Sequence, residues 1–220
     1  MPSNWLDHLT VDHRDLRTAH SRRAQILNRL AADKPLLTEL VHGIEHNPRL
    51  LHESEVHPLI HRLVLYQDDA RGFQIRLHLS PGHGDELVPH DHKYSFTTRI
   101  LAGAYTHVWR RRTDTSDGEF TAADLTPGIV TIERPDSCYT LGHPLVHQTL
   151  MLPGTVTLFM RGPREKDRSH AALDMLPQAD TWPSPAEAGK PKHAGGQRPV
   201  TGNEYRVMRD QLAKQGIITR

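Results

Sequence analysis

The chain has 220 residues, 36% of them hydrophobic, and its 27 Lys and Arg residues almost balance its 26 Asp and Glu residues. This length is sufficient for one well-buried core, so we expect a single domain. Because no charge excess draws the chain to nucleic acid or to an anionic membrane, we expect a small-molecule partner, with no nucleic acid and no membrane involved.

Cysteine content and apolar runs indicate the compartment. The single cysteine, Cys138, excludes an intrachain disulfide framework, and the opening residues MPSNWLDHLT contain no apolar signal core. No apolar run approaches the length that spans a membrane. We therefore expect a cytoplasmic protein.

Residues 1–60 have the pattern of an N-terminal helical segment. Apolar residues of the first stretch fall on one helical stripe, which contains Leu16, Ala19, Ile26, Leu27 and Leu30. Thr10 is the expected N-cap of this helix. A second helix is expected to have Pro35 in its first turn and to end before Pro48.

Residues 61–163 change to a period of two, which predicts an all-β core. In residues 73–79, Phe73, Ile75, Leu77 and Leu79 alternate with Gln74, Arg76 and His78. Similar short strands separated by turns follow in SFTTRILAG, AYTHVWRRR, GIVTIERP, SCYTLGHP and GTVTLFMRGP. Such closely spaced strands favour an antiparallel sandwich or barrel.

Residues 164–220 are expected to form an extended arm and a C-terminal helix. The arm, up to about residue 201, is rich in Pro and Gly and lacks periodicity. In the last helix, Tyr205, Met208 and Leu212 recur at helical spacing, and Gly216 is the expected stop.

Histidine is frequent, at 17 residues, and one pair stands out by its spacing. His90 and His92 are two residues apart, so on a strand they point to the same face and can converge on one metal ion with a third ligand. Imidazole suits Fe, Zn, Ni and Cu, and three protein ligands leave positions open for a substrate. The alternative is that both are solvent-facing strand residues beside a polar loop.

The spacing around this pair resembles the first motif of the cupin family, in which G-x5-H-x-H is followed by a Glu and a Gly. Gly84, His90, His92 and Gly103 match, whereas Thr97 stands at the place of the Glu. The resemblance implies a jelly-roll β-barrel without a carboxylate ligand. The segment GHPLVHQTLMLPGTVTLFMRGP resembles a degenerate second motif, whose histidine is His147. Four residues earlier, His143 competes for that role.

Residues 60–103 resemble cysteine dioxygenase and related thiol dioxygenases in HRLVLYQDDARGFQIRLHLSPGHG and HDHKYSF. The resemblance implies Fe(II) bound by His90, His92 and His147, with Arg62 holding a substrate carboxylate. A guanidinium group suits that role because it pairs with a carboxylate through two hydrogen bonds. The competing interpretation of Arg62 is a surface arginine at a helix end.

The chain also departs from that family. Two extra residues lie between GHG and HDH, and Thr157, Phe159 and Arg161 replace the family's serine, histidine and tyrosine. The family's cysteine position falls at Thr97, whereas Cys138 lies elsewhere, so no cysteine–tyrosine cross-link is expected. If the Thr157 face points inward, Arg161 adds a second cation, which predicts an anionic substrate that is larger than cysteine or carries two acidic groups.

The leading hypothesis is a mononuclear non-haem iron oxygenase or dioxygenase that acts on O2 and a small anionic substrate, with or without a thiol. Tyr94 and Tyr139 are candidate proton donors, or else packing residues, and His78 and His107 are expected to support the site or to lie at the surface. The alternatives are a Zn, Ni or Mn isomerase, lyase or hydrolase, and a non-catalytic cupin that binds a metal or ligand. A homodimer is a reasonable expectation for a cupin.

Overall fold

The structure, a computed structural model, describes residues 6, 8–13, 15–82, 84–175 and 198–220, without the side chains of residues 84–87. The arm predicted for residues 164–201 therefore lies largely outside the described residues. Its described beginning ends in a short 3-10 helix, η4 (Leu173–Met175).

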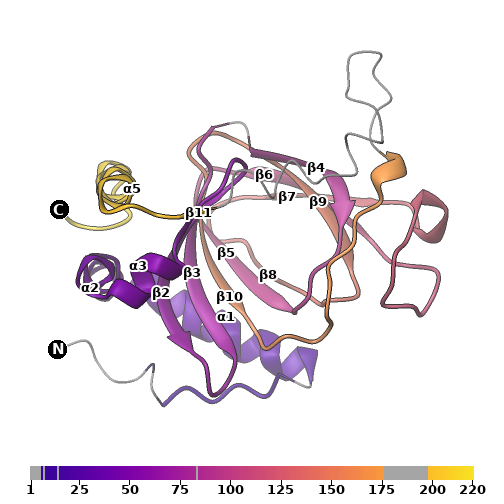
Figure 1. The fold of residues 1–220 in the computed structure, drawn as a ribbon, viewed down its shortest axis with the longest axis horizontal. Helices are drawn as coiled ribbons and strands as arrows, with labels where there is room; N and C mark the ends of the chain where they lie inside the picture. The colour runs from indigo at the N-terminus through magenta and orange to yellow at the C-terminus, as the bar shows by residue number, and fades with distance from the viewer. Residues whose placement is uncertain (1–5, 7, 14, 83, 176–197) are drawn as a thin grey trace.

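Two antiparallel sheets form the core of the fold (Figure 1). The larger sheet has the order β11 (Arg198–Pro199), β1 (Glu55–Val56), β2 (His61–Asp68), β3 (Phe73–Leu79), β10 (Val156–Arg161), β5 (Phe96–Ala102), β8 (Cys138–Leu141). The smaller sheet has the order β4 (Gly84–His90), β9 (Val146–Met151), β6 (Tyr105–Arg110), β7 (Ile129–Glu133). This arrangement confirms the predicted antiparallel jelly-roll barrel.

Three of the described helices pack on the outer face of the larger sheet, as Figure 1 shows at the lower and left side of the barrel: α1 (Leu16–Ala32), α2 (Lys34–Gly43) and α3 (Pro48–Glu53). The C-terminal helix α5 (Gly202–Lys214) is joined to α2 by a hydrogen bond from the Tyr205 hydroxyl to the Val41 carbonyl. A 3-10 turn, η2 (Ile44–His46), joins α2 to α3, and another, η3 (Ala122–Asp124), follows β6. Among the described residues, no helix is both long and apolar enough to cross a bilayer.

Capping residues set where the helices begin. The predicted N-cap Thr10 is wrong, because the Asp15 carboxylate accepts hydrogen bonds from the backbone N–H groups of Arg17 and Thr18 and starts α1 there. Pro35 lies in the first turn of α2, as predicted. Gly216 follows α5 with a φ of 74°, a left-handed conformation that favours glycine at a helix end.

The main hydrophobic core lies between the larger sheet and the helices. Ile75 and Leu77 of β3, together with Leu158 and Met160 of β10, are fully buried against this side. Because successive side chains of a strand point to opposite faces, the alternate residues of β3 and β10 face the barrel interior. The apolar alternation in the sequence therefore marks the outer face of this sheet, and the polar alternation marks the interior.

Aromatic side chains occupy part of the barrel interior. Phe96, Leu141 and Phe159 form a small buried cluster that is separate from the main core. The ring centroids of Phe96 and Phe159 lie 4.8 Å apart. Their position confirms that the Thr157, Phe159 and Arg161 face of β10 points inward.

Candidate metal centre

Three histidines converge at the smaller sheet. The ligand nitrogens of His90, His92 and His147 all lie within 4.8 Å of one another, and Nε2 of His92 lies 2.7 Å from Nε2 of His147. His90 ends β4 and stands opposite His147 of β9 in the antiparallel register. The structure thus brings together the predicted set, although His92 lies beyond the strand and His147 lies within a strand rather than before one.

Hydrogen bonds orient two of these rings. Nδ1 of His90 lies 3.0 Å from the Val88 carbonyl oxygen, which is an acceptor and therefore places the proton on Nδ1. Nδ1 of His147 lies 2.8 Å from Nε2 of His107, and both rings are buried. When Nδ1 carries the proton, the Nε2 lone pair is available to a metal ion.

A carboxylate stands behind His107. Nδ1 of His107 lies 3.7 Å from Oε1 of Glu133, which also accepts a 2.7 Å hydrogen bond from the Thr131 hydroxyl. The His107 ring, and then the Thr131 hydroxyl, hold the pKa of Glu133 below its usual range despite its burial. An ionised Glu133 favours a proton on Nδ1 of His107, which leaves Nε2 of His107 as the acceptor for His147.

Burial favours the neutral form of two candidate ligands, His92 and His147. Desolvation, followed by the neighbouring His90 ring, holds the pKa of His92 and of His147 well below the usual range. A neutral imidazole can bind a metal without first losing a proton. The donor set of three imidazoles therefore fits a divalent transition metal.

The strand after the histidines supplies no carboxylate to this centre. Thr97, the predicted counterpart of the motif's Glu, does not face the histidines, because its hydroxyl lies 2.7 Å from the Thr140 hydroxyl on the side of α1, where His20 also binds Thr140. Phe96 faces them instead, with its ring centroid 4.8 Å from that of His92. The residue that faces the histidines at the place of the motif's Glu is therefore Phe96, one residue before the Thr97 that the sequence suggested.

Arg62 lies inside the fold rather than at a helix end. It belongs to β2, stands opposite His78 of β3, and pairs with Glu55 at 2.8 Å. Its positive charge also contributes to the lowered pKa values of His78 and His92. The placement of Arg62 at a helix end is therefore wrong, and its side chain is 21% exposed.

Arg161 and Tyr94 lie next to each other at the side of the histidine cluster. The Arg161 guanidinium carbon lies 5.3 Å from the Tyr94 ring centroid, and that ring lies 6.1 Å from the ring of His92. Tyr94 therefore separates Arg161 from the candidate ligands by one aromatic ring.

Tyr139 lies farther from the candidate ligands. Its ring packs 4.8 Å from His107, and its hydroxyl pairs with that of Tyr105 at 2.5 Å. Tyr139 thus contacts the ring behind His147, and its hydroxyl is engaged by another tyrosine.

The alternative ligand His143 is held elsewhere. Its Nδ1 atom lies 2.8 Å from Oε2 of Glu165, and it does not belong to the cluster of three histidines. The preference for His147 over His143 agrees with this geometry.

Two interior residues near the site, Arg76 and Glu133, were not singled out from the sequence. Arg76 lies on β3 between Gln74 and His78, on the face that points into the barrel. Strand parity could have identified Arg76, because residues at i and i+2 share a face. No sequence signal could have paired Glu133 with His107, because that contact depends on the register of β6 and β7.

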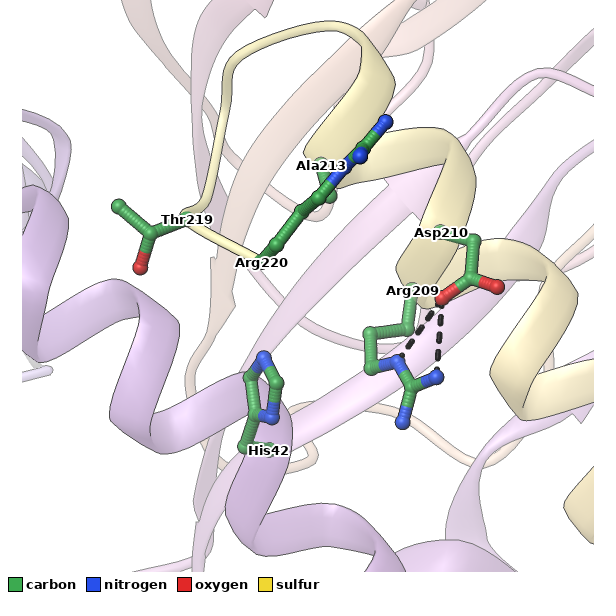
Figure 2. A pocket seen from close by; sticks show the side chains of 6 residues that line it. All are labelled: His42, Arg209, Asp210, Ala213, Thr219 and Arg220. Carbon is green, nitrogen blue, oxygen red and sulfur yellow. Dashed lines mark hydrogen bonds and ion pairs between the residues drawn. The ribbon is translucent and has the colours of Figure 1, made fainter.

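A separate pocket lies between α2 and α5. Its lining residues belong to these helices and to the C-terminus, and none of them is one of the three candidate ligands. Figure 2 shows its lining by His42, Arg209, Asp210, Ala213, Thr219 and Arg220. Arg209 donates two hydrogen bonds to Oδ1 of Asp210, at 2.9 and 3.1 Å. Because this arginine is already paired, we assign no chemistry to the pocket.

Comparisons with known proteins give only a fold-level likeness. No family model matches the chain, and no curated protein is similar to it. Among solved structures, KdgF from Halomonas sp. is 15% identical with a TM-score of 0.37, over 50% of this chain and 84% of that chain. An RmlC-like cupin from Shewanella frigidimarina is 12% identical with a TM-score of 0.37, over 51% and 83%. The hydroquinone 1,2-dioxygenase PnpCD, in complex with Cd2+, is 8% identical with a TM-score of 0.35, over 56% and 70%.

Proposed function

We propose that the chain is a mononuclear metalloenzyme, an Fe(II)-dependent oxygenase that resembles the thiol dioxygenases and acts on a small anionic substrate. The observation that carries the proposal is the convergence of three histidines, His90, His92 and His147, on one point inside the barrel. In His90 and His147, a hydrogen bond at Nδ1 orients the ring so that Nε2 is available to the metal.

The protein's own residues have distinct tasks in this proposal. The metal, held by His90, His92 and His147, would supply activation of O2 and a positive centre for the substrate. His107 keeps His147 in the orientation that presents Nε2. Arg62 holds a carboxylate of the substrate and so limits the positions that the substrate can adopt.

Aromatic rings protect the site from water. Phe96 packs against His92 at 4.8 Å and against Phe159 at 4.8 Å, and both phenylalanines are buried. An apolar surface that excludes water strengthens the interaction of charged groups with the substrate, because the local dielectric constant is low. Tyr94, next to His92, is the candidate proton donor on this surface.

The test is oxygen consumption by the iron-loaded full chain. We expect O2 uptake with at least one member of a panel of small carboxylic acids, with and without thiol groups. Uptake should be lost in His147→Ala and retained in His143→Ala, since His143 is bound to Glu165 outside the cluster. Turnover of a substrate with bound Zn, Ni or Mn and without O2 uptake would replace the oxygenase by Lewis-acid chemistry at the same histidines. Ligand binding without turnover would indicate a binding protein.

A further inference from the structure

Three arginines share the inner face of the larger sheet. Arg62 of β2 stands opposite His78 of β3, and Arg161 of β10 stands opposite Gln74 of β3. Arg76 lies between His78 and Gln74 on the same face of β3. The antiparallel register therefore places the three arginines on a diagonal across β2, β3 and β10, with Arg76 between Arg62 and Arg161.

These arginines carry more positive charge than the nearby acids neutralise. Burial lowers the pKa of Arg76 to about 10, and the charges of Arg62 and Arg161 act in the same direction. Glu55 pairs with Arg62 at 2.8 Å. Among the described residues, no carboxylate forms an ion pair with Arg76 or Arg161, so one acid faces three cations.

Asp69 is a second acid near the cluster, and the charge of Arg161 is one of the interactions that lower its pKa. It lies just after β2, is largely exposed, and pairs with Arg49. Because Asp69 is engaged with its own arginine at the surface, it does not neutralise the interior cluster. Two positive charges therefore remain uncompensated on this inner face.

Some hydrogen-bonding groups of Arg76, Arg161 and His78 on this inner face have no partner among the described residues. Arg76 and Arg161 both donate from Nε to the single oxygen of Gln74, the second at 3.3 Å. In the part of the chain that the structure describes, their terminal nitrogens donate no hydrogen bond to protein. Nε2 of His78 is buried and has no partner among these residues, and the His78 side chain is only 9% exposed.

The arginine cluster adjoins the histidines. Tyr94 contacts both, since its ring lies 6.1 Å from His92 and 5.3 Å from the Arg161 guanidinium carbon. The His78 ring stacks on Phe159 at 4.4 Å, and Phe159 contacts Phe96, which packs on His92. Aromatic rings therefore link the arginines to the histidines, and the charge of Arg62 acts on both His78 and His92.

We propose that Arg76 and Arg161 form a second anion-binding subsite beside Arg62, so that the site takes a short-chain dicarboxylate. This inference rests on the proposed function in taking the histidines as the place of chemistry. One carboxylate of the ligand pairs with Arg62 and the other with the terminal nitrogens of Arg76 and Arg161, while Nε2 of His78 bonds to the ligand. A dianion matches the two uncompensated charges, and the ligand gives a partner to the buried Nε2 of His78, which has none among the described residues.

The experiment is calorimetric titration of the metal-loaded full chain with malonate, succinate and glutarate, in a buffer without multivalent anions. Succinamate is the matched control ligand, because it has the shape of succinate and only one negative charge. We expect the best dicarboxylate to bind about 10- to 100-fold more tightly than a monoanion of its size, as hydrogen bonds between charged groups are strong.

Variants locate the second subsite. In Arg76→Gln, the affinity for the dicarboxylate should fall to that for the monoanion, and the affinity for the monoanion should not change. Arg161→Gln should do the same, and it serves as the test if Arg76→Gln fails to fold. Arg206→Gln is the control for charge alone, because Arg206 is exposed and pairs with Glu45.

Equal affinity for succinate and succinamate across the series would overturn the proposal, as would a dianion preference that survives in both Arg76→Gln and Arg161→Gln. The metal content of the same samples separates this result from the proposed function. Stoichiometric metal without a dianion preference would remove the second subsite and leave the metal centre. A dianion preference in a protein that binds no metal would remove the proposed oxygenase and leave an anion site.

Discussion

Nε2 of His107 lies 2.8 Å from Nδ1 of His147, in a buried contact between neighbouring strands β6 and β9. Behind His107 stands the ionised carboxylate of Glu133, at 3.7 Å. This chain of three side chains fixes which nitrogen of His147 carries a proton. The candidate metal centre therefore depends on residues that do not contact the metal.

His107→Ala should weaken metal binding by about 10- to 100-fold, the usual cost of losing such a supporting partner. Glu133→Gln should have a smaller effect in the same direction, since it removes the charge that favours a proton on Nδ1 of His107. Competition with a chromophoric chelator for Zn2+ measures both. His143→Ala is the matched control, and equal affinity in His107→Ala and His143→Ala would contradict the supporting role.

Arg23 should be critical for stability. Its side chain is fully buried, donates a 3.0 Å hydrogen bond to the Ser95 carbonyl, and contacts His13. Arg23→Ala leaves this carbonyl with the Gly162 N–H, at 3.0 Å, as its remaining donor and opens a cavity under α1, so we expect a loss of about 2–4 kcal/mol in the free energy of unfolding. Arg22→Ala, at the exposed neighbouring position, should change it by less than about 0.5 kcal/mol. Urea denaturation measures both variants, and similar midpoints would contradict the assignment.

Strand parity in β10 separates stability from binding. Leu158 is fully buried on the helix side, so Leu158→Ala should lower the free energy of unfolding by about 2–5 kcal/mol. Metal affinity should be unchanged in this variant, because the truncated side chain faces away from the barrel interior. Phe159→Ala, on the inner face, should alter ligand binding as well as stability. If Leu158→Ala impaired Zn2+ affinity as strongly as His107→Ala, the two faces would be assigned wrongly.

Acid should destabilise the metal-free protein before its carboxylates titrate. Burial lowers the pKa of His13 to about 4, and it holds the pKa values of His78, His92 and His147 well below the usual range. The unfolded chain, with histidine pKa values near 6.5, then binds more protons than the folded chain. These histidines contribute their full stability above that pH, and the contribution is lost as the pH falls.

We therefore expect the melting temperature of the metal-free protein to fall between about pH 6.5 and pH 5. His78→Gln should show a shallower dependence, because it removes one buried histidine that takes up a proton on unfolding. Differential scanning calorimetry at a series of pH values measures the slope. A constant melting temperature over this interval would show that the buried histidines bind protons equally in both states.

Sequence periodicity was sufficient for the fold class, because alternating apolar residues in 73–79 and 156–161 mark strands with one buried face. It did not say which face is which, and here the apolar face packs on helices while the polar face lines the barrel. Helix starts were less predictable. Asp15 rather than Thr10 caps α1, since the choice between two capping residues depends on local backbone geometry.

The candidate ligands could be predicted from motif spacing, whereas strand parity does not place His92, which lies beyond β4. Contacts between distant strands could not be predicted, and the site depends on several of them. Glu133 meets His107 only through the register of β6 and β7, and Arg76 joins Arg161 only through that of β3 and β10. Likewise, Phe96 rather than Thr97 faces the histidines because the inward parity of β5 is set by its pairing with β10.

The most direct test of the central claim is metal analysis of the full chain, purified without a metal-binding tag and equilibrated with Fe(II) without oxygen. We expect about one ion per chain in the native protein and in His143→Ala, and none in His92→Ala or His147→Ala. Absence of metal from the native protein would rule out a metal centre at these histidines. So would the same metal content in His92→Ala and His147→Ala as in the native chain.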